Sequence, residues 1–93
     1  MRSGIDVFHE IWNEIESHGN REEFEEMEKT LDTFNAVQKG VLYRTLLSAA
    51  YPDWVNFSAE ELLILYSGVK SLTEEQGKLM SILICYAKAM YAD

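Results

Sequence analysis

Apolar residues recur along most of the chain at steps of three and four, the spacing that places side chains on one face of an α-helix. The first such series is Ile5, Phe8, Ile11, Trp12 and Ile15. Ser3 precedes it as a candidate N-cap. Gly19 follows it, and a glycine there can take the left-handed conformation that ends many helices. The pattern predicts a helix over residues 4–17.

A second apolar series follows a wide acidic face and predicts a helix over residues 21–38. Its members are Phe24, Met27, Leu31 and Phe34. The series slips out of phase near Gly40, and a third series then predicts a helix over residues 41–51. Two alternatives stay open: the second helix continues to a kink or break at Gly40, or it stops near residues 32–33.

The only proline in the chain, Pro52, ends the third helical segment. Proline has no amide hydrogen for the helical ladder and disfavours a helical conformation at the preceding residue. Trp54, Val55 and Phe57 follow it within a loop. We expect the aromatic side chains of this loop, Trp54 and Phe57, to plug one end of a helical bundle.

Two tetrapeptides have the form of capping boxes, in which an N-cap hydroxyl and the side chain three residues later bond each other's backbone amides. They are residues 58–61, Ser-Ala-Glu-Glu, and residues 73–76, Thr-Glu-Glu-Gln. They predict helices over residues 59–71 and 74–91. Since no segment alternates at period two, the 93 residues are expected to form an all-α, single-domain bundle of four to five helices.

The last predicted helix is apolar on almost every side, and such a helix is normally covered on every side. Two arrangements would achieve this. The helix could lie at the centre of the bundle, or one face could be covered by another chain, either a second copy or a different partner. For the second case we expect a homodimer contact through four residues of this helix: Met80, Ile84, Ala87 and Tyr91.

Composition excludes several classes of protein. The chain is 47% hydrophobic, too high a proportion for a disordered chain. Its 16 Asp and Glu against 8 Lys and Arg give a net charge of −8, which argues against direct nucleic-acid binding. It has no uncharged apolar run long enough to span a membrane, and Asp6 and Glu10 interrupt any signal peptide. A cytoplasmic protein without membrane contact is expected.

The negative charge is concentrated in the first third of the chain. Residues 1–32 hold ten acidic and three basic side chains, whereas residues 33–93 hold six and five. The predicted acidic face consists of Glu22, Glu23, Glu25, Glu26, Glu28 and Asp32. Carboxylates three or four residues apart on a helix lie roughly 5–6 Å from each other. Such a face could bind a basic protein surface, in the sharpest case by mimicking nucleic-acid phosphates, or it could simply be solvated.

Residues with catalytic or metal-binding potential are few and scattered. Cys85 lies among apolar residues and is expected to be an inert core side chain. His9 and His18 are nine residues apart, so they point to different sides of one helix. The chain has neither a His-Glu-x-x-His motif nor a pair of cysteines, which argues against a zinc site. No enzyme activity, metal or cofactor is expected.

These observations favour a non-enzymatic module that binds other proteins. Small acidic helical proteins are found among immunity proteins, antitoxins, phage-encoded inhibitors and secretion chaperones, a likeness of size and charge rather than of motif. We therefore expect an inhibitor or adaptor whose acidic face binds a basic protein, for example a nucleic-acid-binding one. The alternative is an assembly subunit that homo-oligomerises through the apolar C-terminal helix.

Overall fold

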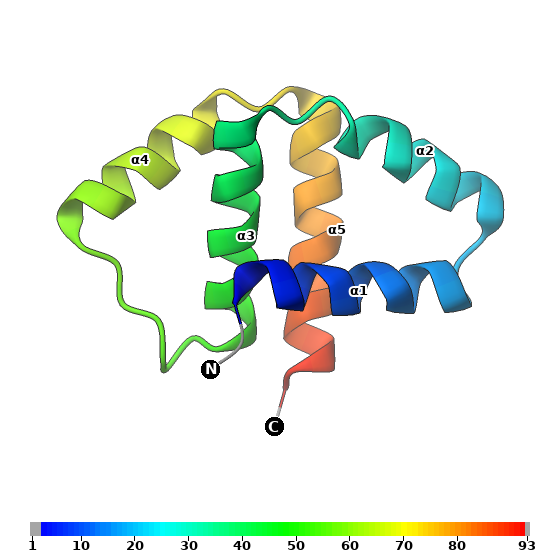
Figure 1. The fold of residues 1–93 in the computed structure, drawn as a ribbon, viewed down its shortest axis with the longest axis horizontal. Coiled ribbons are helices and arrows are strands. Elements are labelled where there is room, and N and C mark those ends of the chain that lie inside the picture. Colours follow the sequence, from blue (N-terminus) through cyan, green and yellow to red (C-terminus); the bar gives the residue numbers. More distant parts are fainter. Residues whose placement is uncertain (1–2, 93) are drawn as a thin grey trace.

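A computed structural model describes residues 3–92 and contains five α-helices in this range (Figure 1). The helices are α1 (Gly4–His18), α2 (Arg21–Leu31), α3 (Ala36–Ala50), α4 (Ala59–Lys70) and α5 (Glu74–Met90). The predicted all-α bundle is confirmed. The predicted bounds of the first, fourth and fifth helices agree with the structure to within one residue at each end.

Two parallel helices form the centre of the bundle. α3 and α5 pack side by side and run in the same direction, because α4 and its loops carry the chain back between them (Figure 1). α1 crosses both, while α2 packs mainly on α5 and α4 on α3. α2 and α4 therefore lie at opposite ends of the long axis (Figure 1). The Cα atoms extend 39 × 32 × 16 Å, so the bundle is thin.

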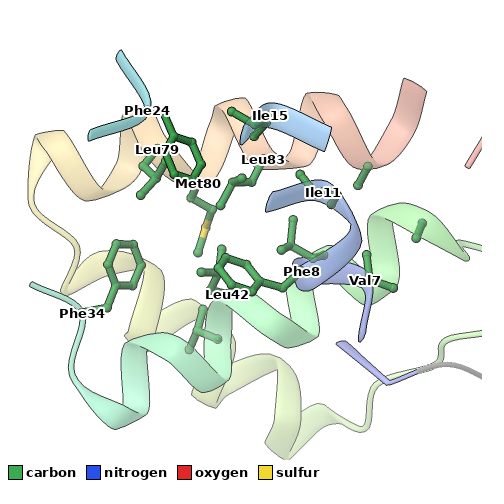
Figure 2. Close-up of a cluster of buried hydrophobic side chains, with 14 residues drawn as sticks. Val7, Phe8, Ile11, Ile15, Phe24, Phe34, Leu42, Leu79, Met80 and Leu83 are labelled. Carbon is green, nitrogen blue, oxygen red and sulfur yellow. The ribbon is translucent and has the colours of Figure 1, made fainter. Parts of the chain in front are cut away.

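The core lies where α1 crosses α3 and α5. α1 contributes Val7, Phe8, Ile11 and Ile15, which all lie on the face predicted from their spacing. Figure 2 shows them facing side chains from the central helices, with Phe24 and Phe34 at one side. The central helices contribute Val41, Leu42, Leu46, Ala50, Leu79, Met80, Leu83 and Ala87. α5 is therefore central on this face. It is not covered on every side, as the central alternative expected, because Ile82, Tyr86 and Met90 are exposed.

The predicted helix over residues 21–38 is wrong. α2 ends at Leu31, and α3 begins at Ala36 and runs unbroken through Gly40. The cause is a capping box: the Asn35 side chain accepts from the Gln38 amide at 2.8 Å, and the Gln38 side chain accepts from the Asn35 amide at 2.9 Å. Of the two alternatives, the stop near residues 32–33 is the one observed.

The end of α1 also differs from expectation. Gly19 has φ −91° and ψ 172°, an extended conformation, and no residue from 3 to 92 has a positive φ. Its amide donates to the carbonyl oxygen of Ile15 at 2.7 Å, which satisfies one carbonyl at the helix end. The Asn20 side chain then accepts from the amides of Glu22 and Glu23 and opens α2 directly. The chain therefore leaves α1 in an extended conformation at Gly19 and enters α2 at the next residue, without a left-handed position.

A buried pair of amides joins the starts of α3 and α5. Nε2 of Gln38 donates to Oε1 of Gln76 at 3.2 Å, and Nε2 of Gln76 donates to Oε1 of Gln38 at 3.3 Å. Each side chain also belongs to the capping box of its own helix, and Gln76 donates to the Thr33 hydroxyl at 2.9 Å. Both amides are buried and satisfied, so this network fixes the two helix starts relative to each other.

Replacing Gly77 with alanine is expected to stabilise the protein. Gly77 lies in the first turns of α5, and a Cβ built there would meet nothing within 4 Å. Alanine should raise the free energy of unfolding by about 0.5–1 kcal/mol, because it restricts the unfolded chain and favours the helix. Urea denaturation followed by circular dichroism measures the change. An unchanged or lower midpoint would contradict the prediction.

Candidate protein-binding surfaces

The predicted acidic face is a fully solvent-facing side of α2. All six of its carboxylates are exposed: Glu22, Glu23, Glu25, Glu26, Glu28 and Asp32. The opposite side holds the helix on the bundle through buried Phe24 and partly buried Met27 and Leu31. The ring centroid of Phe24 lies 5.0 Å from that of Trp12 on α1. The spacing of apolar residues thus correctly separated the packed and the exposed sides of this helix.

Few basic groups neutralise this surface. Glu25 pairs with Arg21 at 3.5 Å and Glu26 with Lys29 at 3.3 Å, both as exposed pairs along the helix. Such pairs contribute little, because water screens them. The remaining carboxylates form no ion pair with any residue between 3 and 92: Glu22, Glu23, Glu28 and Asp32. The acidic face therefore presents uncompensated negative charge to the solvent.

The residues of α5 that were predicted to form a homodimer contact are not exposed to solvent. Met80 and Ala87 are buried in the core, and Ile84 and Tyr91 are partly buried against it. The Tyr91 ring contacts that of Tyr51, and its hydroxyl donates to the carboxylate of Glu10. The prediction of these four residues as a homodimer contact is therefore wrong, because α1 and α3 cover that side. The exposed apolar side chains of α5 lie elsewhere on it: Ile82, Tyr86 and Met90.

α4 carries an uncovered apolar surface that sequence reasoning missed. Gly68 is its only buried residue, and Leu65 is partly buried. Five large apolar side chains on this helix are between 48% and 66% exposed: Leu62, Leu63, Ile64, Tyr66 and Val69. With 12 residues α4 is short, and no helix within residues 3–92 is long and apolar enough to cross a membrane.

A signal for this surface exists in the sequence. Ala59, Leu62, Tyr66 and Val69 follow one another at steps of three, four and three, which defines one stripe along the helix. A shallow groove of about 700 Å³ runs along it, with Leu63 and Leu65 as its other lining residues. We call these four residues the α4 seam. Leu65 and Gly68 form a separate stripe toward α3, so α4 is apolar on two sides and uses only one.

The loop after Pro52 is less buried than predicted. Trp54 is 72% exposed, whereas Val55 and Phe57 are partly buried, so the expectation that the aromatic residues plug the bundle is wrong for the tryptophan. An open hollow of about 1290 Å³ separates this loop and α4 from the ends of α3 and α5. Trp54, Phe57 and Leu62 are among its lining residues. The loop stands away from the core because α4 packs only near its own C-terminal end.

The residues with chemical potential remain apart. Cys85 is exposed rather than buried, so the expectation of a core cysteine is wrong: α5 turns that side away from α1 and α3. His9 is exposed, and His18 lies 3.4 Å from the Glu14 carboxylate on the surface of α1. Across residues 3–92 no three His, Cys, Asp or Glu side chains are placed to hold a metal ion.

Two surfaces therefore stand out, the acidic face of α2 and the seam of α4. They lie at opposite ends of the long axis and are separated by the central helices (Figure 1). One is strongly charged and the other strongly apolar, so each suits a different kind of contact. Comparison of the chain with protein-family models, with curated proteins and with solved structures finds no match.

Proposed function

We propose that this protein is a non-enzymatic binding module, an inhibitor or adaptor, whose acidic face engages a basic surface on another protein. The observation that carries the proposal is the exposure of all six carboxylates on one helix, four of them without an ion pair among the described residues. Complementary charge raises association rates and selects partners. Both effects need charges that neighbouring side chains do not already neutralise.

The rigidity of α2 supports the same proposal. Phe24 is buried and Asn20 caps the helix, so the carboxylates sit on an ordered element rather than on a mobile tail. Rows of charge along a helix fit a groove lined by lysine and arginine, including a groove that otherwise binds nucleic-acid phosphates. We also propose a cytoplasmic setting, which the exposed thiol of Cys85 supports, since free thiols persist in reducing compartments.

Charge reversal of the acidic face tests the proposal. The variant carries Glu22→Lys, Glu25→Lys and Glu26→Lys, which changes the local charge by six units without touching Phe24. Wild-type protein immobilised on beads should capture basic proteins from a lysate of the source cells, and the variant should capture them at least about tenfold less. Capture should also fall as salt rises, because exposed charges are screened. Quantitative mass spectrometry of the bound fraction provides the measurement.

A control variant with the same change in net charge shows whether capture depends on the acidic face of α2 or only on the total charge of the chain. Glu14→Lys, Glu16→Lys and Glu75→Lys reverse three exposed carboxylates outside α2. This control should capture the same proteins as the wild type, and all three chains should have equal helical content. Equal capture by the α2 variant would contradict the proposal. If the acidic face mimics phosphates and the captured protein also binds DNA, an added DNA duplex should compete with the acidic face and release the captured protein from the beads.

A further inference from the structure

The hollow beside the loop after Pro52 has the size and the lining of a small-molecule site. Its volume of about 1290 Å³ is of the same order as the roughly 300–1,000 Å³ typical of such sites. The ends of α3 and α5, the loop and the first two turns of α4 form its walls, and most of the lining residues are apolar or aromatic. Trp54 lines the hollow and is 72% exposed, so a bound ligand would remove a large aromatic surface from water.

The aromatic rings at the hollow favour a particular class of ligand. Within residues 3–92 four aromatic residues line it: Tyr51, Trp54, Phe57 and Tyr91. The rings of Tyr51 and Tyr91 pack edge to face with their centroids 5.4 Å apart, and the Tyr91 hydroxyl donates to the carboxylate of Glu10. The face of an aromatic ring carries partial negative charge and attracts a cation within about 6 Å. Several rings around one hollow therefore suit a protonated or quaternary amine.

The backbone adds negative charge at the same place. α3 and α5 run parallel, so both direct their C-terminal ends, the negative ends of their dipoles, toward the hollow (Figure 1). α3 has no basic residue in its last turn. Pro52 has no amide hydrogen to donate to the carbonyl oxygen of Ser48. No backbone amide within residues 3–92 donates to the carbonyl oxygens of Ala49 and Ala50. The end of α3 therefore attracts positive charge.

The charged side chains at the hollow place the negative charge beside α3. Among residues 3–92 two charged side chains line it, Asp53 and Lys88. Asp53 follows the end of α3 and forms no ion pair with any residue between 3 and 92. Lys88 lies in the last turn of α5, so it offsets the dipole of that helix rather than that of α3. The net charge of −8 also attracts cations to the chain from a distance.

From these observations we infer that the hollow binds a small organic cation, namely a protonated or quaternary amine attached to an apolar body. The ammonium group is held near the end of α3, beside Asp53 and the aromatic rings. The apolar body packs against Leu62 and Leu65, which α4 contributes to the same hollow. The inference is independent of the proposed function, since it uses none of the α2 residues.

Three compounds with nearly the same body and different charge test the inference: cyclohexylmethyltrimethylammonium, cyclohexylmethanol and cyclohexylacetate. Each is titrated at constant ionic strength into isotope-labelled protein, and NMR follows the indole N–H signals of the two tryptophans. The ammonium compound should shift the Trp54 signal with a dissociation constant of about 1 mM or lower, about tenfold below that of the alcohol. The Trp12 signal should stay in place, because that ring packs against Phe24 of α2 and does not line the hollow.

Two results would overturn the inference. The first is a Trp54 signal that shows no saturable shift with the ammonium compound. The second is binding of the acetate as tight as that of the ammonium compound, because the hollow would then select for the apolar body alone. Equal shifts of the Trp12 and Trp54 signals would also contradict a site at the hollow, since they would reflect general attraction of cations to an acidic chain.

Removal of the Asp53 charge tests the electrostatic part of the site. Asp53→Asn should weaken binding of the ammonium compound about threefold and leave binding of the alcohol unchanged, since the side chain keeps its size. Glu60→Gln is the matched control, because it removes an exposed carboxylate of α4 that does not line the hollow. It should leave the binding of both compounds unchanged. An equal loss in the two variants would show that only net charge attracts the ammonium compound, and would contradict the inferred site.

Replacement of Trp54 tests the aromatic contact. Trp54→Leu keeps an apolar side chain, and the exposure of Trp54 means that the fold does not depend on it. Binding of the ammonium compound, followed through the backbone amides of Tyr51 and Tyr91, should weaken about fivefold, and binding of the alcohol should weaken less. Lys88→Met should strengthen binding of the ammonium compound about twofold, because it removes a like charge. Equal losses for both compounds in Trp54→Leu would contradict the contact between the cation and the ring.

Discussion

Replacing Gln76 with alanine should lower the free energy of unfolding by about 3 kcal/mol, a large part of the stability of a domain of this size. The substitution removes the side chain that joins Thr33, Gln38 and the Thr73 amide. Gln38 would lose both of its bonds to Gln76 and keep only those to Ser71 and the Asn35 amide. Bonds lost at a buried amide are more costly than a hydrogen bond lost on the surface, where water replaces it. Urea denaturation by circular dichroism measures the loss.

A matched control exists in α4. Glu61 occupies the same capping-box position as Gln76, and its side chain accepts from the Ser58 amide at 3.2 Å. It is exposed and makes no hydrogen bond to another helix within residues 3–92, so Glu61→Ala should cost only about 0.5–1 kcal/mol. If Gln76→Ala costs no more than Glu61→Ala, the buried amide pair contributes nothing beyond capping, and the prediction is wrong.

The double variant separates pairing from capping. Gln38→Leu together with Gln76→Leu removes both buried amides and fills their space with apolar groups. Its cost should be at least about 1 kcal/mol smaller than the sum of the two single changes, because neither partner is left unsatisfied. Additive costs would show that the two side chains act independently.

The sequence predicted the helices best where local chemistry alone decides their ends. The capping boxes at Ser58 and Thr73 need only two residues that are three apart in the chain, and α4 and α5 begin where they predicted. The Asn35 box was missed because asparagine and glutamine resemble ordinary surface residues, and the buried partner that gives Gln38 its role is far away in the chain. Phe34 continues the apolar spacing of α2 although it lies in the connection between α2 and α3. The spacing of apolar residues therefore could not reveal where α2 ends.

The same distinction between local sequence and distant contacts decides which surfaces could be predicted. The acidic face was predictable, because charged side chains on the side opposite Phe24 have no reason to be buried. The face of α5 was not, since a helix apolar on nearly every side carries no local sign of which side meets α3. α4 is apolar on two sides, yet the chain has too few elements to cover every apolar side. Which helix remains uncovered depends on packing, which a single sequence does not show.

The contact that places α4 depends on one glycine, and Gly68→Ala should disrupt it. A Cβ on Gly68 would overlap Cγ2 of Val41, which is fully buried in α3. Because backbone and core side chain approach so closely, the added methyl group should lower the free energy of unfolding by about 2–3 kcal/mol. Gly77→Ala is the control of opposite sign, since the same added group meets open space in α5.

The location of the damage can also be tested. α4 packs mainly on α3, so the helix can separate while the other four stay together. Amide hydrogen exchange should therefore accelerate in α4 of Gly68→Ala by more than in α5, as expected for a locally opened element. Val41→Ala makes room for the new methyl group, so the double variant should recover about 1 kcal/mol relative to the sum of the single changes. Uniform acceleration across all helices, with no recovery in the double variant, would show that the glycine serves the whole bundle rather than the α3–α4 contact.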